Sequence, residues 1–162
     1  REYFYNPLPW MYKPSPVILL CIGTDRSTGD SLGPLVGERL KVNCTHAKVL
    51  GDLAEPVHAT NLHKILDEIE NQYIDPFVIA IDASLGRSEN VGTIKLAPGS
   101  LKPGAGVNKD LPAVGNFHIT GIVNVGGFME YLVLQNTRLF TVVKMANIIA
   151  DGISQGLNRF FG

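Results

Sequence analysis

The chain has 162 residues, of which 18% are charged and 45% hydrophobic, and its formal net charge is −1. This length fits one domain with a sizeable core. The near-neutral charge supplies no general basic field, so we expect neither nucleic acid nor a membrane surface as a partner. No apolar stretch approaches the roughly 20 residues of a membrane span, and no signal peptide is recognisable.

The two cysteines, Cys21 and Cys44, form no CxxC pair. This usage is typical of a reduced, intracellular protein, and we expect Cys21 to act as a small apolar residue in a buried strand. Because the sequence begins with arginine, the natural protein could have a longer amino terminus.

Residues 1–15, "REYFYNPLPWMYKPS", are rich in aromatic residues and proline and show neither helical nor strand periodicity. We expect an arm that is frayed or docked on the surface of the domain formed by residues 16–162. Its aromatic residues could also cover a sheet edge or meet a second subunit of a homo-oligomer.

The first half of the domain alternates between strand and helix patterns. An unbroken apolar run over 16–22 predicts a buried strand, and residues 33–41 predict a helix. A short strand is expected over 47–50. Apolar residues at helical spacing predict a second helix over 60–73, capped by Thr60 or Asn61.

The second half begins with another unbroken apolar run, 77–81, which is typical of a strand covered on both faces. Further strands are expected over 92–97 and 118–125. They are separated by a glycine- and proline-rich loop, 98–112, of a length that is usually functional or mobile. From residue 128 to 161 the chain reads as helix, with a break near Asn136 and Thr137.

Alternating strands and helices predict an α/β fold: a three-layer sandwich with a mostly parallel sheet of about five strands between helices, similar to phosphorylase or hydrolase folds. In such a sheet, the functional site lies beyond the carboxyl ends of the strands, where the strand order reverses.

The loop after the first strand, in "CIGTDRSTGDSLGP", carries Arg26 and Asp30 ahead of a helix. It has no GxGxxG or GxxxxGK[ST] pattern, so neither a dinucleotide site nor a P-loop is predicted. The helix amino terminus, assisted by Arg26, could still hold an anion. Considered alone, Asp30 fits a helix-capping role better than a catalytic one.

Asp82 follows the apolar run 77–81 directly, so we expect it to be buried or to face a cleft. If the two strands are neighbours, about 4.8 Å apart, Asp30 and Asp82 could converge. Two such carboxyl groups would share a proton and act as acid and base on water, or would hold a cation jointly. The alternative is a purely structural role, in which Asp82 stabilises its loop by accepting hydrogen bonds from backbone N–H groups.

The other polar candidates are weaker. His118 begins a strand and could face the cleft, although a lone histidine is more often structural; Arg26 and Arg87 could bind a substrate carboxylate or lie on the surface. No histidine spacing matches HxxxH or HExxH, so we predict no metal ligands of that kind. No serine stands in a GxSxG pattern.

Five stretches carry a resemblance to a known family: "IGTDRSTGDSLGP", "AIDASLGR", "GSLKPGAGVNKDLPAVG", "HITGIVNVGGFMEY" and "LQNTRL". Over nearly all of the chain after the arm, the sequence resembles the YyaC family of sporulation proteins. That family is related to the germination protease of spore-forming bacteria and more distantly to the hydrogenase-maturation peptidases. The similarity to the germination protease lies in "GDSLGP", "IAIDA" and "PGAGVNK".

The resemblance implies an unusual peptidase with an acidic catalytic pair, which falls on Asp30 and Asp82, and a cytoplasmic location in a sporulating cell. Arg26, Arg87, His118 and Asn124 are assigned to substrate binding, and the loop 98–112 would close over the peptide. We expect no cofactor, apart from a cation that the two aspartates could hold. The protease is longer than this chain, and "IVNVGGFMEY" lacks the valine–proline turn that the protease has there.

Three functions follow from these observations. The first is a peptidase that hydrolyses a peptide bond in a protein or peptide substrate. The second is an inactive peptide-binding or regulatory module on the same fold. Hydrolysis of a small amide or nucleoside-type substrate is a third, since a fold does not determine specificity.

Overall fold

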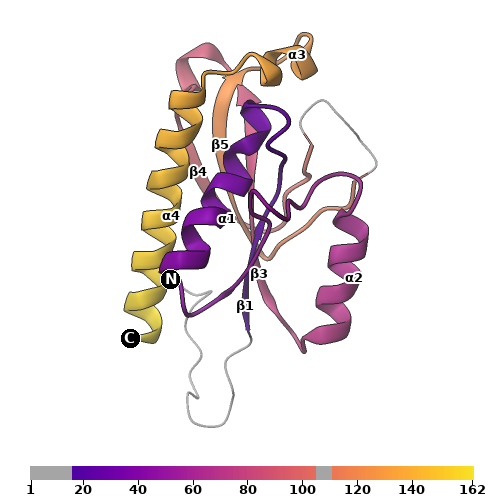
Figure 1. Cartoon of the computed structure of the whole chain (residues 1–162), viewed down its shortest axis with the longest axis vertical. Helices are drawn as coiled ribbons and strands as arrows, with labels where there is room; N and C mark the ends of the chain where they lie inside the picture. Colours follow the sequence, from indigo (N-terminus) through magenta and orange to yellow (C-terminus); the bar gives the residue numbers. More distant parts are fainter. Residues whose placement is uncertain (1–15, 105–110) are drawn as a thin grey trace.

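The computed structural model describes residues 16–104 and 111–162. Five strands in this part of the chain form one sheet in the order β2-β1-β3-β5-β4 (Figure 1). Only β4 runs antiparallel to its neighbour. The mostly parallel sheet predicted from the sequence is therefore confirmed. Its strands are β1 (Val17–Cys21), β2 (Lys48–Leu50), β3 (Phe77–Gly86), β4 (Ile94–Pro98) and β5 (Phe117–Val125).

Helices cover both faces of the sheet (Figure 1). One face carries α1 and α4, and the opposite face carries α2. The predicted break near Asn136 and Thr137 is confirmed, because a short helix ends just before it and a long one begins just after it. The helices are α1 (Leu32–Asn43), α2 (Leu62–Gln72), α3 (Glu130–Gln135) and α4 (Leu139–Phe161), with 3-10 turns η2 (Gly29–Ser31) and η3 (Ser88–Asn90).

The first strand, β1, is buried on both sides. Leu19 and Cys21 pack into the cluster with α1 and α4, while Ile18 and Leu20 pack into the cluster with α2. Successive side chains of a strand point to opposite faces, so an unbroken apolar run is what a strand between two helical layers requires. Cys21 is a buried free thiol, as expected.

The third strand, β3, is longer than the sequence predicted. It does not end at Asp82 but continues to Gly86. Pairing with β5 extends from Ile79 opposite Phe117 to Gly86 opposite Val125, whereas pairing with β1 stops at Ile81. At Asp82, β3 is therefore still paired with β5 but is no longer paired with β1.

The loop predicted over 98–112 is described only in part, because residues 105–110 and the arm 1–15 lie outside the described residues. Within the described part, Leu101 and Val114 form an antiparallel bridge, which continues the pairing of β4 with β5. Within 16–104 and 111–162, no helix combines the length and apolar character needed to cross a bilayer.

The strand order reverses between β1 and β3. The chain passes from β1 through α1 to β2 on one side, and then through α2 to β3 on the other side of β1. Open α/β sheets bind ligands outside the carboxyl ends of the strands at such a switch point. The loop after β1 and the Asp82 position of β3 both lie there.

Candidate active site

Two glycines hold the loop after β1 against the end of the sheet. At Gly23 φ is +146°, and a Cβ there would lie 2.0 Å from the carbonyl oxygen of Asp30. A Cβ on Gly33 would lie 2.1 Å from the carbonyl oxygen of Ile22. The same Asp30 carbonyl accepts the N–H of Thr24 at 3.0 Å. Only residues without a side chain allow this close approach of α1 and η2 to the strand end.

This loop brings Asp30 beside β3. The N–H of Ile22 donates to the carbonyl oxygen of Ile81 at 2.7 Å, so the loop leaves the sheet next to the residue that precedes Asp82. The turn η2, which contains Asp30, packs against β3. The charge of Asp30 is close enough to affect the ionisation of Asp82. Asp30 and Asp82 therefore lie on neighbouring parts of the same end of the sheet, and their action as a pair remains a prediction.

Asp82 is 5% exposed. Burial raises the pKa of its carboxyl group to about 8, and the charge of Asp30 adds to the rise. Two backbone donors oppose the shift: Gly104 donates its N–H to Oδ2 at 3.4 Å and Ala83 donates to Oδ1 at 2.8 Å. With a pKa near 8, Asp82 holds its proton at neutral pH.

Asp52 is the other buried aspartate in the described part of the chain, and it serves as a comparison because its carboxylate has a structural role. Burial acts to raise its pKa, but Lys41 Nζ and the N–H of Glu55 donate to its oxygens, and the pKa is lowered overall. Asp82 takes part in none of the ion pairs among the described residues. A buried carboxyl group without a cation is a functional-site candidate.

Asp30 is half-buried, and burial raises the pKa of its carboxyl group. The nearby Ser27 hydroxyl lowers the pKa of Asp30 in part. Ser27 Oγ is itself buried, and within the described residues it has no partner in full hydrogen-bond geometry. The capping role that the sequence alone favoured is not observed. The residue at the N-cap of α1 is Ser31, and that N-cap has no side-chain capping hydrogen bond.

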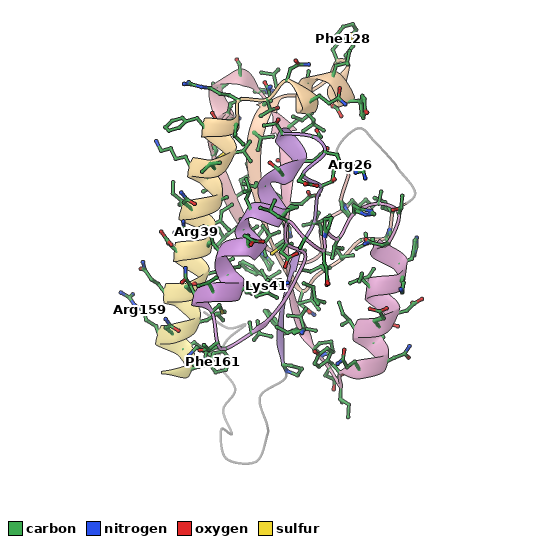
Figure 2. The ribbon with its side chains drawn as sticks, viewed as in Figure 1. Arg26, Arg39, Lys41, Phe128, Arg159 and Phe161 are labelled. Carbon is green, nitrogen blue, oxygen red and sulfur yellow. The ribbon has the colours of Figure 1, made fainter. Side chains whose placement is uncertain are left out.

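The two arginines lie at the same end of the sheet but on the surface. Arg26 is exposed on the loop after β1 (Figure 2). Arg87 is also exposed, 4.0 Å from Glu89, and lines a shallow cavity of about 540 Å³ beyond the ends of β3 and β5. Both guanidinium groups are open to a ligand, so their assignment to substrate binding remains a prediction.

His118 and Asn124 both make contacts within the protein. His118 Nδ1 lies 2.9 Å from the carbonyl oxygen of Gly99, next to β4. Asn124 Nδ2 donates to Thr137 Oγ1 at 3.2 Å and to the carbonyl oxygen of Val133 at 3.4 Å. These contacts give each side chain a structural role, and their assignment to substrate binding remains a prediction.

Sequence reasoning did not find the Gly104 N–H or the Ser27 hydroxyl as parts of the site. Ser27 lies in the opening loop and Gly104 in the loop 98–112, both of which the sequence singled out. Their closeness to the aspartates depends on how each loop folds back over the sheet, which residue type and spacing do not encode. Within residues 16–104 and 111–162, no cluster of three or more His, Cys, Asp or Glu side chains could hold a metal.

A comparison of folds relates this architecture to a solved structure. The [NiFe] hydrogenase maturation protease HycI from Thermococcus kodakarensis KOD1 superposes with a TM-score of 0.58. The match covers 89% of this chain and 93% of HycI, at 18% sequence identity. At this level of identity the likeness is one of fold, and it confirms the predicted α/β architecture.

A comparison of sequences finds a much nearer relative. "Uncharacterized protein YyaC" of Bacillus subtilis (strain 168) is 59% identical over 140 residues, which are 86% of this chain and 68% of that protein. A family model described as "Protein of unknown function (DUF1256)" matches residues 2–152. The resemblance to YyaC that the sequence motifs predicted is confirmed. The chain therefore belongs to the DUF1256 family.

Proposed function

We propose that this protein is a peptidase of the sporulating cell, located in the cytoplasm, which hydrolyses a peptide bond with the pair Asp30 and Asp82. The observation that carries the proposal is the state of Asp82: a buried carboxyl group, without a cation, whose pKa is raised to about 8 beside a second carboxyl group. The HycI-like fold and the motif resemblance to the germination protease support it.

The two aspartates would take different roles because their surroundings differ. Asp82, protonated at neutral pH, donates a hydrogen bond to the carbonyl oxygen of the scissile peptide. Asp30, less buried, acts as the base that removes a proton from the attacking water. The tetrahedral intermediate collapses as the amine leaves with the proton held by Asp30. Asp82 retains its own proton at the end of the cycle.

A polypeptide substrate fits the surroundings of the pair. Apolar side chains stand exposed at the end of the sheet where β5 leads into α3; Phe128 is 78% exposed and points away from the body of the protein (Figure 2). Tyr131 is 58% exposed. Exposed apolar groups of this kind mark surfaces that bind other proteins. Arg26 and Arg87 would orient the chain by its carboxylates or carbonyl oxygens.

The test is cleavage of proteins extracted from spores, followed by mass spectrometry of the new termini. The wild-type protein should produce discrete cleavages that both Asp30→Asn and Asp82→Asn abolish. Asp67→Asn is the matched control, because Asp67 lies exposed on α2 away from the pair. Circular dichroism should show that all three variants are folded. Cleavage that persists in both active-site variants would contradict the assignment.

The need for a cation is tested in the same assay. Without a metal in the mechanism, dialysis against a chelator should leave the cleavage rate unchanged. If activity were lost and then restored by a divalent cation, the two aspartates would be ligands and not an acid–base pair.

The second candidate is a peptide-binding module without catalysis, and one observation favours it. Both carboxyl oxygens of Asp82 already accept backbone N–H groups, from Ala83 and Gly104, as a carboxylate that braces a loop would. In that case wild type and Asp82→Asn would retain the same spore peptides on an affinity column without cleaving them.

A further inference from the structure

An open apolar groove lies away from the acidic pair, on the face of the sheet that carries α4. Its volume is about 830 Å³, and α4 forms one wall while β3, β4 and β5 form the other. The side chains that define it are Ile79, Leu96, Phe117, Ile148, Ile153 and Phe160. Among the described residues that line it, Arg159 alone is charged.

The walls of the groove leave room for another segment. Leu96 on β4 is 63% exposed and Ile148 on α4 is 53% exposed. A Cβ added to Gly152 or Gly156, both on the groove wall, would meet no atom within 4 Å. An apolar channel of this size on a protein surface is typical of a binding surface.

The amino-terminal arm has the composition to fill such a channel. Residues 1–15 carry five aromatic side chains and three prolines, and also the apolar residues Leu8 and Met11. Proline-rich segments bind grooves lined by aromatic side chains without joining a sheet, and at a low cost in conformational entropy. The family match begins at residue 2, so the arm is part of the sequence pattern of the family.

The arm also enters the described structure close to the groove. The carbonyl oxygen of Pro16 accepts the N–H of Phe77 at 2.9 Å, at the amino ends of the strands. Val17 pairs with Phe77, and Phe117 of the groove pairs with Ile79 on the same strand. Pro16 is therefore about 10 Å, or two strand spacings, from the strand that carries Phe117. Fifteen residues span up to about 50 Å, which is more than enough to follow the groove.

We propose that residues 1–15 bind in the α4 groove of their own chain and cover its apolar walls. Attachment at Pro16 places the arm at an effective concentration of about millimolar or higher, which favours it over a second copy at ordinary protein concentrations. The arm then completes the core on this face of the sheet.

Trp10, the single tryptophan of the chain, reports on this contact directly. In the full chain, its fluorescence emission should lie at short wavelength and acrylamide should quench it poorly. Gly152→Glu places a carboxylate in the groove and should move the emission to longer wavelength and increase quenching. Glutamate is a better helix former than glycine, so α4 is retained. Gln155→Glu adds the same charge on the exposed side of α4 and should leave the emission unchanged.

Three results would overturn the proposal. The first is solvent-like emission from Trp10 in the wild-type chain. The second is shielded emission that Gly152→Glu does not change. The third is emission that shifts on dilution together with dissociation of a dimer, which would assign the groove to a second copy.

Discussion

The backbone N–H of Gly104 donates to Oδ2 of Asp82, so the segment after β4 reaches over a buried acid on β3. The contact is long, 3.4 Å, and it lowers the pKa less than burial raises it. The hydrogen bonds therefore hold the acid in place, but they do not offset the cost that burial imposes on its anion. This balance determines how the protein should respond to pH.

Stability should fall as pH rises from about 4 to about 8. The folded state holds a proton on Asp82 up to a pKa of about 8, whereas the unfolded chain releases it near 3.8. Between these values the folded state binds more protons, so each pH unit costs up to about 1.4 kcal/mol of unfolding free energy. Asp82→Asn should make this slope much smaller in urea unfolding at several pH values, whereas Asp67→Asn should keep it. An unchanged slope in Asp82→Asn would contradict the assignment.

Replacing Asp30 should change the titration of Asp82. Since the charge of Asp30 is one of the causes that raise the pKa of Asp82, Asp30→Asn should lower it. Carboxyl carbon shifts followed by NMR would measure the change. Asp25→Asn, on the exposed part of the same loop, is the matched control and should leave the pKa of Asp82 where it is. Equal values in wild type and Asp30→Asn would mean that the two groups do not interact.

Two glycine substitutions should have opposite effects on stability. In Gly33→Ala the new methyl group would overlap the Ile22 carbonyl oxygen, and helix and strand would have to separate. We expect a loss of about 2–4 kcal/mol, similar to other severe core changes. A methyl group in Gly152→Ala meets no atom of the described residues within 4 Å and is far smaller than the carboxylate that Gly152→Glu introduces, so this variant should gain roughly 0.5–1 kcal/mol from helix propensity. Thermal unfolding of both variants measures these two changes. A Gly33→Ala protein as stable as wild type would contradict the close approach of α1 to the Ile22 carbonyl.

Asn124→Ala distinguishes a structural amide from a substrate-binding one. Loss of the bonds to Thr137 and to the Val133 carbonyl should destabilise the protein by about 1–2 kcal/mol and speed hydrogen exchange in α3. A variant of unchanged stability and raised KM would instead assign Asn124 to the substrate.

The sequence was sufficient for the strand and helix order because apolar periodicity carries that information. The run 17–21 is buried on both faces, and the helix break near Asn136 is where the sequence places it. It was not sufficient for the end of β3, since whether Asp82 stays in a strand depends on β5, which is about 40 residues away along the chain. The pairing of Asp82 with Gly104 is likewise a tertiary contact.

The outermost strands of the sheet have a consequence for aggregation. At one edge β2 has only three residues, and at the other edge β4 carries Lys95 and ends at Pro98. Short strands, lysine and proline all discourage a second sheet from adding to an open edge. A partially unfolded chain should therefore resist growing into cross-β fibres from its native edges, and fibre formation would require prior exposure of β1 or β3.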